Sequence, residues 1–170
     1  ETIYQQVLQA NPSHAGALNL LGLLTYQTGN YPRAEQWLRQ AIAINQNVPE
    51  FYNHLGLALH AQGQLAEATT SYRQALHLQP DFAEAYSNLG SVLKAQGQLE
   101  EAVTSYRQAL TLNPDYIEVY KNLGITLALQ NRLAEAEECY RQVLTRQPNL
   151  ADAHYNLGNI LQLQRKLEEA

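Results

Sequence analysis

The sequence predicts an all-α fold, a solenoid of antiparallel helix pairs, and three observations support this prediction. First, glycine returns at a constant step along the chain, at Gly22, Gly56, Gly90, Gly124 and Gly158. Second, residues 49–82 and 83–116 are identical at 22 of 34 aligned positions. Third, apolar residues within each period have helical spacing. A unit that repeats in this way buries its apolar surface against its neighbours, so the units stack into an extended array.

The period divides the chain into a single array over residues 1–170. We expect full repeats at residues 15–48, 49–82, 83–116 and 117–150. Residues 1–14 then form the end of a preceding repeat, and residues 151–170 form the first part of a further one. Because the sequence contains no methionine, we expect Glu1 not to be the native start, and the chain to be a fragment of a longer array.

Each repeat is expected to contain two helices. In residues 83–116, the first apolar stripe consists of Tyr86, Leu89, Gly90 and Leu93. The second consists of Leu99, Ala102, Tyr106, Ala109 and Leu110. Small residues such as Gly90 and Ala102 let the two helices approach closely.

The ends of these helices are marked by residues with known end preferences. A left-handed turn between the two helices is predicted at Gly29, Gly63, Gly97 and Asn131. The expected N-caps of the first helices are Ser13, Asn47, Asp81, Asp115 and Asn149. An acidic residue follows three positions later in most repeats, as in a capping box.

Composition excludes several classes of function. The net charge of −5 offers no electrostatic footprint for nucleic acid. The longest apolar run, Leu20 to Leu24, is too short to span a membrane, and no signal peptide is visible. The single cysteine, Cys139, cannot form an internal disulfide, which suits a reducing compartment, so we expect a cytoplasmic protein.

The repeated pattern closely resembles tetratricopeptide (TPR) repeats. This resemblance implies a right-handed superhelix whose first helices line a concave groove, where an extended peptide or partner helix binds. The resemblance is closest to the repeats of O-linked N-acetylglucosamine transferase-like proteins, as judged from the segments NLG, AQGQLEEA and YRQAL.

Asparagines in the first helices are the main candidate binding residues. Asn88, Asn122 and Asn156 occupy one repeat position, at which Leu20 and His54 depart from the pattern. In the transferase family, asparagines at this position bind the backbone of a peptide. A carboxamide has both a donor and an acceptor, so it can pair with any peptide group. The alternative is that these asparagines bond only neighbouring helices or water.

Charged residues on the same helices are expected to adjust the preference of the groove. The expected groove residues besides the asparagines are His54, Glu84, Glu118, Lys94 and Lys121. The acidic positions have an alternative role as helix caps. Asn19 and Asn53, one position earlier than the asparagine row, are expected to point elsewhere.

The remaining polar residues are expected to be structural. The row Arg39, Arg73, Arg107 and Arg141 predicts a solvated outer face, with Glu35–Arg39 and Glu137–Arg141 as pairs one helical turn apart. Cys139 is expected to be a surface or groove thiol. No catalytic motif, metal-ligand spacing, cofactor motif or basic clamp for a terminal carboxylate is evident.

The sequence therefore predicts a non-catalytic scaffold that binds a protein or peptide segment. One alternative is the substrate-recognition arm of a glycosyltransferase whose catalytic domain lies outside this chain. The other is a self-assembling solenoid, because residues 166–170 followed by residues 1–12 would read as one uninterrupted second helix and permit head-to-tail association.

Overall fold

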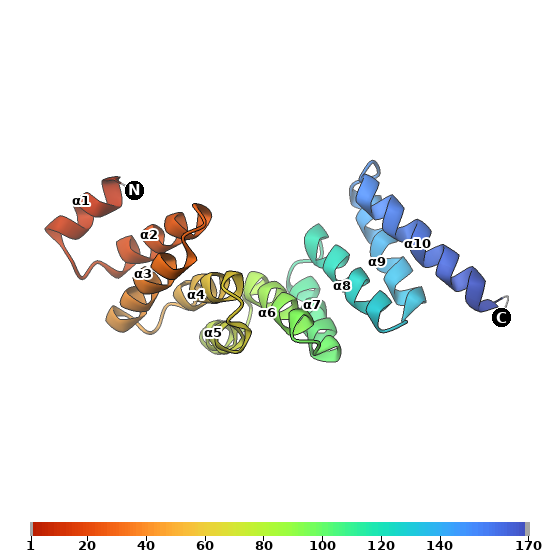
Figure 1. The fold of residues 1–170 in the computed structure, drawn as a ribbon, viewed down its shortest axis with the longest axis horizontal. Helices are drawn as coiled ribbons and strands as arrows, with labels where there is room; N and C mark the ends of the chain where they lie inside the picture. The colour runs from red at the N-terminus through yellow and green to blue at the C-terminus, as the bar shows by residue number, and fades with distance from the viewer. Residues whose placement is uncertain (1, 169–170) are drawn as a thin grey trace.

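The protein is an all-α solenoid, as a computed structural model describing residues 2–168 shows (Figure 1). No strand occurs among the residues described. The helices are α1 (Thr2–Ala10), α2 (Ala15–Gln27), α3 (Tyr31–Ile44), α4 (Pro49–Ala61), α5 (Leu65–Leu78), α6 (Ala83–Ala95), α7 (Leu99–Leu112), α8 (Ile117–Leu129), α9 (Leu133–Arg146) and α10 (Ala151–Glu168). Each packs mainly against the helices before and after it in sequence, so the array is long and open.

The turns within the helix pairs have the predicted left-handed conformation. Gly29, Gly63 and Gly97 have φ angles of 81°, 75° and 76°, and Asn131 has a φ of 59°. This conformation reverses the chain and sends the second helix back along the first. The turn prediction is therefore confirmed at all four positions.

The recurring glycine of the first helices allows a close approach to an aromatic ring. A Cβ atom on Gly56 would lie 2.5 Å from Cε1 of Tyr72, and one on Gly90 would lie 2.7 Å from Cδ1 of Tyr106. Both rings are fully buried. Contact between the two helices of a pair therefore explains the glycine at Gly56 and at Gly90, because a Cβ at either position would overlap the tyrosine ring.

The buried tyrosines differ in how their hydroxyl groups are satisfied. Tyr106 Oη donates to Ser91 Oγ at 3.1 Å, whereas Tyr72 Oη is buried without a hydrogen-bond partner among the described residues. The position equivalent to Ser91 in the preceding repeat is Leu57, which offers no acceptor.

We therefore expect opposite outcomes from the same substitution at the two tyrosines. Tyr106→Phe should lower the free energy of unfolding by about 1 kcal/mol, because it removes a satisfied hydrogen bond. Tyr72→Phe should leave this free energy unchanged or raise it, because it removes an unsatisfied buried hydroxyl. Urea denaturation followed by circular dichroism measures both, and a larger loss at Tyr72 would contradict this account.

The predicted N-caps are wrong by one residue. The caps of α2, α4, α6 and α8 are His14, Val48, Phe82 and Tyr116. Of these, only His14 caps with its side chain, whose Nδ1 accepts from the backbone N–H of Ala17 at 3.1 Å.

Asparagines at the ends of the preceding helices accept hydrogen bonds from the backbone N–H groups of the residues that were predicted as N-caps. Asn45 Oδ1 accepts from the N–H of Asn47 at 3.0 Å, and Asn113 Oδ1 accepts from the N–H of Asp115 at 3.2 Å. The chain thus makes a local turn before the helix begins. The acidic residues then fall in the second helical position rather than the third, so the capping-box interpretation is also wrong.

The last helix continues where the earlier first helices end. α10 runs to Glu168, and Arg165 stands at the position that Gly29, Gly63 and Gly97 occupy in earlier repeats. A side chain with a Cβ disfavours the left-handed conformation, so the helix does not turn there. Residues 166–168 are therefore not the start of a separate second helix, as the sequence suggested. Residues 1, 169 and 170 lie outside the described part of the chain.

Cys139 is a buried residue, and the expectation of a surface or groove thiol is wrong. It is 7% exposed, and burial raises the pKa of its thiol to about 11. The small side chains at this position, Ser71 and Ser105, are buried to the same extent.

We expect the buried thiol to resist modification in the folded protein. A disulfide reagent such as dithionitrobenzoate at pH 8 should react slowly with the native chain and rapidly in denaturant, because the thiolate is the reacting species. The measurement is the release of the coloured thiol product with time. Equal rates in both conditions would contradict the burial of Cys139.

Candidate functional site

The concave surface of the solenoid is formed by the first helix of each pair. α2 contacts α4, α4 contacts α6, and α6 contacts α8. The second helices stand further apart, since a pocket of about 460 Å³ lies between α3 and α5 and one of about 310 Å³ between α5 and α7. The array therefore bends toward its first helices.

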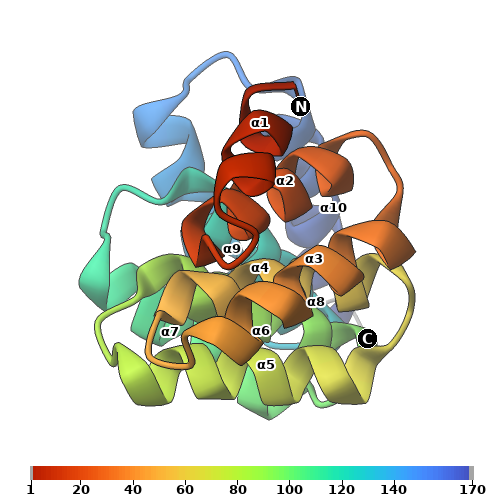
Figure 2. The same ribbon diagram turned by 90° about the vertical axis from the view of Figure 1, so that its left-hand side faces the viewer.

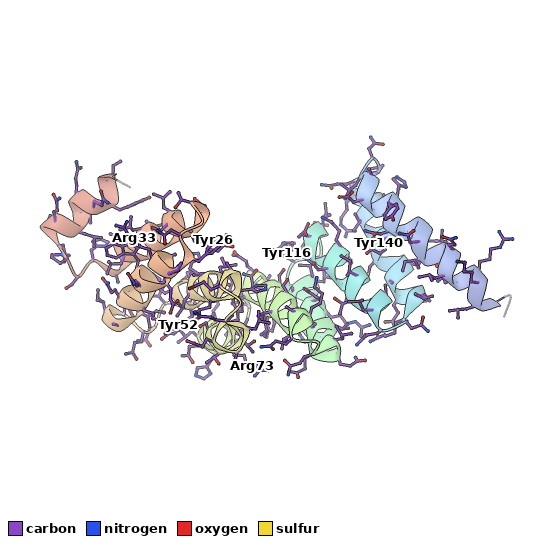
Figure 3. All side chains as sticks on the ribbon, viewed as in Figure 1. Tyr26, Arg33, Tyr52, Arg73, Tyr116 and Tyr140 are labelled. Atoms are coloured by element: carbon purple, nitrogen blue, oxygen red, sulfur yellow. The ribbon has the colours of Figure 1, made fainter. Side chains whose placement is uncertain are left out.

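The views of the molecule agree with this curvature. Figure 1 shows an arc that opens upward, and Figure 2 shows the helices stacked along its long axis. Figure 3 places Tyr26 of α2 on the inner side of the arc and Arg73 of α5 on the outer side. We call the inner surface over α2, α4, α6, α8 and α10 the groove.

A chain of side-chain hydrogen bonds joins α4 to α6 in the groove. Asn53 Nδ2 donates to Glu84 Oε1 at 3.0 Å, and Asn88 Nδ2 donates to Asn53 Oδ1 at 3.0 Å. Because a carboxylate only accepts, Glu84 fixes the orientation of the Asn53 amide, and Asn53 then fixes Asn88. Asn88 Oδ1 has no partner within residues 2–168. Asn53 is fully buried, so it does not line the surface of the groove itself and acts there only through its bond to Asn88.

The second of these bonds has a counterpart one repeat earlier, between α2 and α4. His54 Nδ1 lies 2.8 Å from Asn19 Oδ1. Because Oδ1 can only accept, His54 donates from Nδ1. Burial lowers the pKa of His54, against the smaller opposing effect of the Glu84 and Glu50 carboxylates. Asn19 therefore has the same supporting role as Asn53.

A lysine orients the next asparagine in the row. Lys94 Nζ on α6 donates to Asn122 Oδ1 on α8 at 3.1 Å. An ammonium group only donates, so the Asn122 carboxamide must turn its oxygen toward Lys94 and its Nδ2 away. Burial lowers the pKa of Lys94, and the charge of Glu118 opposes this effect.

The other predicted groove residues do not form hydrogen bonds between neighbouring first helices within residues 2–168. Lys121 Nζ lies 2.8 Å from Glu118 Oε2 on the same helix. Asn156 on α10 is half-buried and has no hydrogen bond to another residue within 2–168. The structure thus brings Glu84 and Asn88 together through Asn53, and Lys94 and Asn122 directly, while Asn156 stands apart.

The outer face carries a second network that sequence reasoning missed. The two predicted pairs within a helix are present, with Arg39–Glu35 at 2.8 Å and Arg141–Glu137 at 2.6 Å. In addition, Arg39 bonds Glu67 at 2.7 Å, Arg73 bonds Glu101 at 3.1 Å, and Arg107 bonds Glu135. The two partners lie at the same sequence separation in all three of these pairs. That constant spacing was the available signal for ion pairs between successive second helices.

Membrane-spanning and metal-binding features are absent from the described part of the chain. Within residues 2–168, no helix is both long and apolar enough to cross a membrane. No cluster of three or more His, Cys, Asp or Glu side chains in that range is arranged to hold a metal ion.

Comparison with protein-family models matches most of the chain to one family. A model described as TPR repeat matches residues 24–63 and 56–97. Two models described as tetratricopeptide repeat match residues 81–149 and 139–170. A search of curated protein sequences gave no significant match.

Several solved structures have the same fold. The Pseudomonas aeruginosa protein pilF is 27% identical, with a TM-score of 0.81 over 89% of this chain and 69% of that one. YrrB, described as a TPR protein with an unusual peptide-binding site, is 22% identical, with a TM-score of 0.80 over 95% of this chain and 84% of that one. TTC0263, a thermophilic TPR protein of Thermus thermophilus, is 24% identical, with a TM-score of 0.78 over 95% and 88% of the two chains.

The stacked helix pairs and the groove define this molecule as a helical repeat scaffold. Its repeat length, its turn residues and the three matching family models place it more narrowly. The chain belongs to the tetratricopeptide-repeat family.

Proposed function

We propose that this chain is a non-catalytic interaction scaffold that binds an extended protein segment along its groove. The residues that contact this segment are Asn88, Asn122, Asn156, His54, Glu84, Glu118, Lys94 and Lys121. The proposal includes the division into repeats at residues 15–48, 49–82, 83–116 and 117–150. It also includes a reducing location such as the cytoplasm, with the unpaired Cys139 as its support.

The main support for this proposal is that neighbouring charged side chains orient the groove asparagines. Glu84 acts through Asn53 on Asn88, and Lys94 acts directly on Asn122. One carboxamide is thereby left with a free acceptor and the next with a free donor. A peptide backbone alternates donors and acceptors, so it complements this surface whatever its side chains are. Fixed amides lose little conformational freedom when they bind.

Simple magnitudes define the kind of binding expected. Packed helices lie about 8–10 Å apart and an extended chain rises about 3.3 Å per residue, so each asparagine serves about three residues. Each hydrogen bond contributes about 0.5–1.5 kcal/mol net. Three of them give only about the 4 kcal/mol of millimolar affinity, so the asparagines alone make a weak and sequence-tolerant site.

A selection experiment tests this proposal. A display library of random twelve-residue segments is selected on the wild-type chain and on the Asn88→Ala, Asn122→Ala, Asn156→Ala variant. We expect the wild-type pool to lose binding to the variant, while circular dichroism shows the helices intact. A pool that binds both chains equally would overturn the groove as the binding surface.

A second candidate function is self-assembly through the ends of the array. Tyr155, Leu161, Leu163 and Leu167 of α10 are exposed large apolar residues, as is Ile3 of α1. A concentration-dependent mass in sedimentation would favour it over the scaffold, and a monomer at high concentration would remove it. The remaining alternative, an arm of a glycosyltransferase, has no support from the described residues beyond the repeat pattern.

A further inference from the structure

Lys94 has no carboxylate partner within residues 2–168, unlike the cations there that form ion pairs. Its Nζ donates to the neutral Asn122, and no carboxylate of the described residues lies within 4.0 Å. Lys121 and six arginines do have a carboxylate partner. The six arginines are Arg39, Arg73, Arg107, Arg132, Arg141 and Arg146. The charges of those cations are balanced by carboxylates of the chain itself.

Burial makes this missing partner costly. Lys94 is half-buried, and burial lowers the pKa of its ammonium group. Removing an ammonium group from water without a counter-charge is unfavourable. An anion bound beside Lys94 would offset this cost, which a fully solvated lysine does not incur.

The charged groups that face Lys94 do not already supply that anion. The nearest helix on one side carries His60, whose pKa is lowered first by burial and then by the charge of Lys94. The helix on the other side carries Glu118, which acts on Lys94 through space and is itself ion-paired with Lys121 at 2.8 Å. Among residues 2–168, the surroundings of Lys94 therefore contain a histidine whose charged form is disfavoured and a carboxylate shared with Lys121, with no free carboxylate in contact.

Two residues with unused hydrogen-bond donors are neighbours at this point of the groove, joined by the bond from Lys94 Nζ to Asn122 Oδ1. Because Asn122 turns its oxygen to Lys94, its Nδ2 is directed away with unused hydrogens. An ammonium group has three hydrogens, so Lys94 retains donors after its bond to Asn122. A carboxylate accepts from several donors at once and carries the complementary charge.

We propose that Lys94 and Asn122 bind the side-chain carboxylate of an aspartate or glutamate in the bound segment. This inference rests on the proposed function, since it requires a segment in the groove. It adds a specific position to an otherwise sequence-tolerant surface. About three residues away along the segment, Glu84 and Asn88 Oδ1 present acceptors, and they favour a donor there.

Another role for Lys94 would be purely structural. It lies in the last turn of α6, where a cation is favourable near the helix carbonyl groups. That role predicts a small loss of stability on substitution and no change in which peptides bind. The two roles therefore differ in peptide preference, which is the quantity to measure.

The test uses the selected peptide pool with amidated C-termini, so that only side chains offer a carboxylate. Selections are run on the wild-type chain, on Lys94→Gln and on Arg107→Gln. Arg107→Gln removes the same charge from the outer face, where Arg107 pairs with Glu135. We expect one position of the wild-type pool to be enriched in Asp and Glu, and this enrichment to persist in Arg107→Gln and vanish in Lys94→Gln.

A double-mutant cycle on one selected peptide then measures the contact. Replacing its acid with the matching amide should weaken binding to the wild type by about tenfold, as for a charge-assisted hydrogen bond. The same replacement should have little effect on binding to Lys94→Gln. Fluorescence anisotropy of the labelled, amidated peptide gives the four dissociation constants.

Failure of this inference can be told from failure of the proposed function. A pool that depends on Asn88 and Asn122 but shows no acidic position would overturn the inference and leave the groove proposal standing. Equal acidic enrichment on wild type and Lys94→Gln would also overturn it. A wild-type pool that binds the triple asparagine variant as well as it binds the wild-type chain would overturn both.

Discussion

Replacing Leu59 with alanine is expected to lower the free energy of unfolding by about 2–5 kcal/mol. Leu59 on α4 is 1% exposed and belongs to the continuous core between successive helices. Truncation removes its buried area and leaves a cavity that the surrounding helices fill only in part. Urea denaturation followed by circular dichroism gives the size of the loss.

The chain contains a matched control for this substitution. Leu161 occupies the same repeat position on α10, where no second helix of its own repeat packs within residues 2–168, and it is 43% exposed. Leu161→Ala should cost about 1 kcal/mol or less, because much of its surface already contacts water. Equal losses at the two positions would show that burial between neighbouring helices is not what stabilises the array.

Replacing Gly90 with alanine is expected to lower the free energy of unfolding by about 1–3 kcal/mol. The new Cβ would lie 2.7 Å from two ring carbons of Tyr106, which is fully buried. Overpacking of this kind forces the helices apart. The same denaturation experiment measures the loss.

Gly158 provides the control for Gly90. It has the same repeat position, but a Cβ there would have no neighbour within 4 Å among the described residues. Gly158→Ala should raise the free energy of unfolding by up to about 1 kcal/mol, because alanine favours the helix more than glycine does. A loss of stability at Gly158 would mean that the effect at Gly90 comes from the backbone and not from Tyr106.

Sequence reasoning predicted the features that are set by local chemistry and by the repeat period. The left-handed turns at Gly29 and Asn131 follow from the conformational freedom of those residues. The close approach at Gly90 follows from its recurrence at a constant step. Each of these features requires a particular residue type at a fixed position, whatever the orientation of the neighbouring repeats, and can therefore be recognised in the sequence.

The features that sequence reasoning missed depend on local hydrogen bonds that precede a helix, or on contacts between residues that are far apart in sequence. Asn45 Oδ1 bonds the backbone beyond its own helix end, and the next helix starts one residue later than predicted. Cys139 packs against Gly124 of α8, and this contact between the two helices of a pair is not apparent from the residues next to Cys139 in sequence. The orientation of Asn122 depends on Lys94 in the preceding repeat, and could be found only once both helices were placed.

The most direct test of the groove as the binding surface is a nuclear magnetic resonance titration. An amidated peptide selected on the wild-type chain is added to the isotope-labelled protein, and the side-chain amide signals of Asn88 and Asn122 are followed. We predict that both signals shift on binding, while the backbone signals of Thr70 and Thr104, which line the pockets between second helices, stay in place. Shifts at Thr70 and Thr104 with unchanged asparagine signals would contradict the account and place the partner on the outer face.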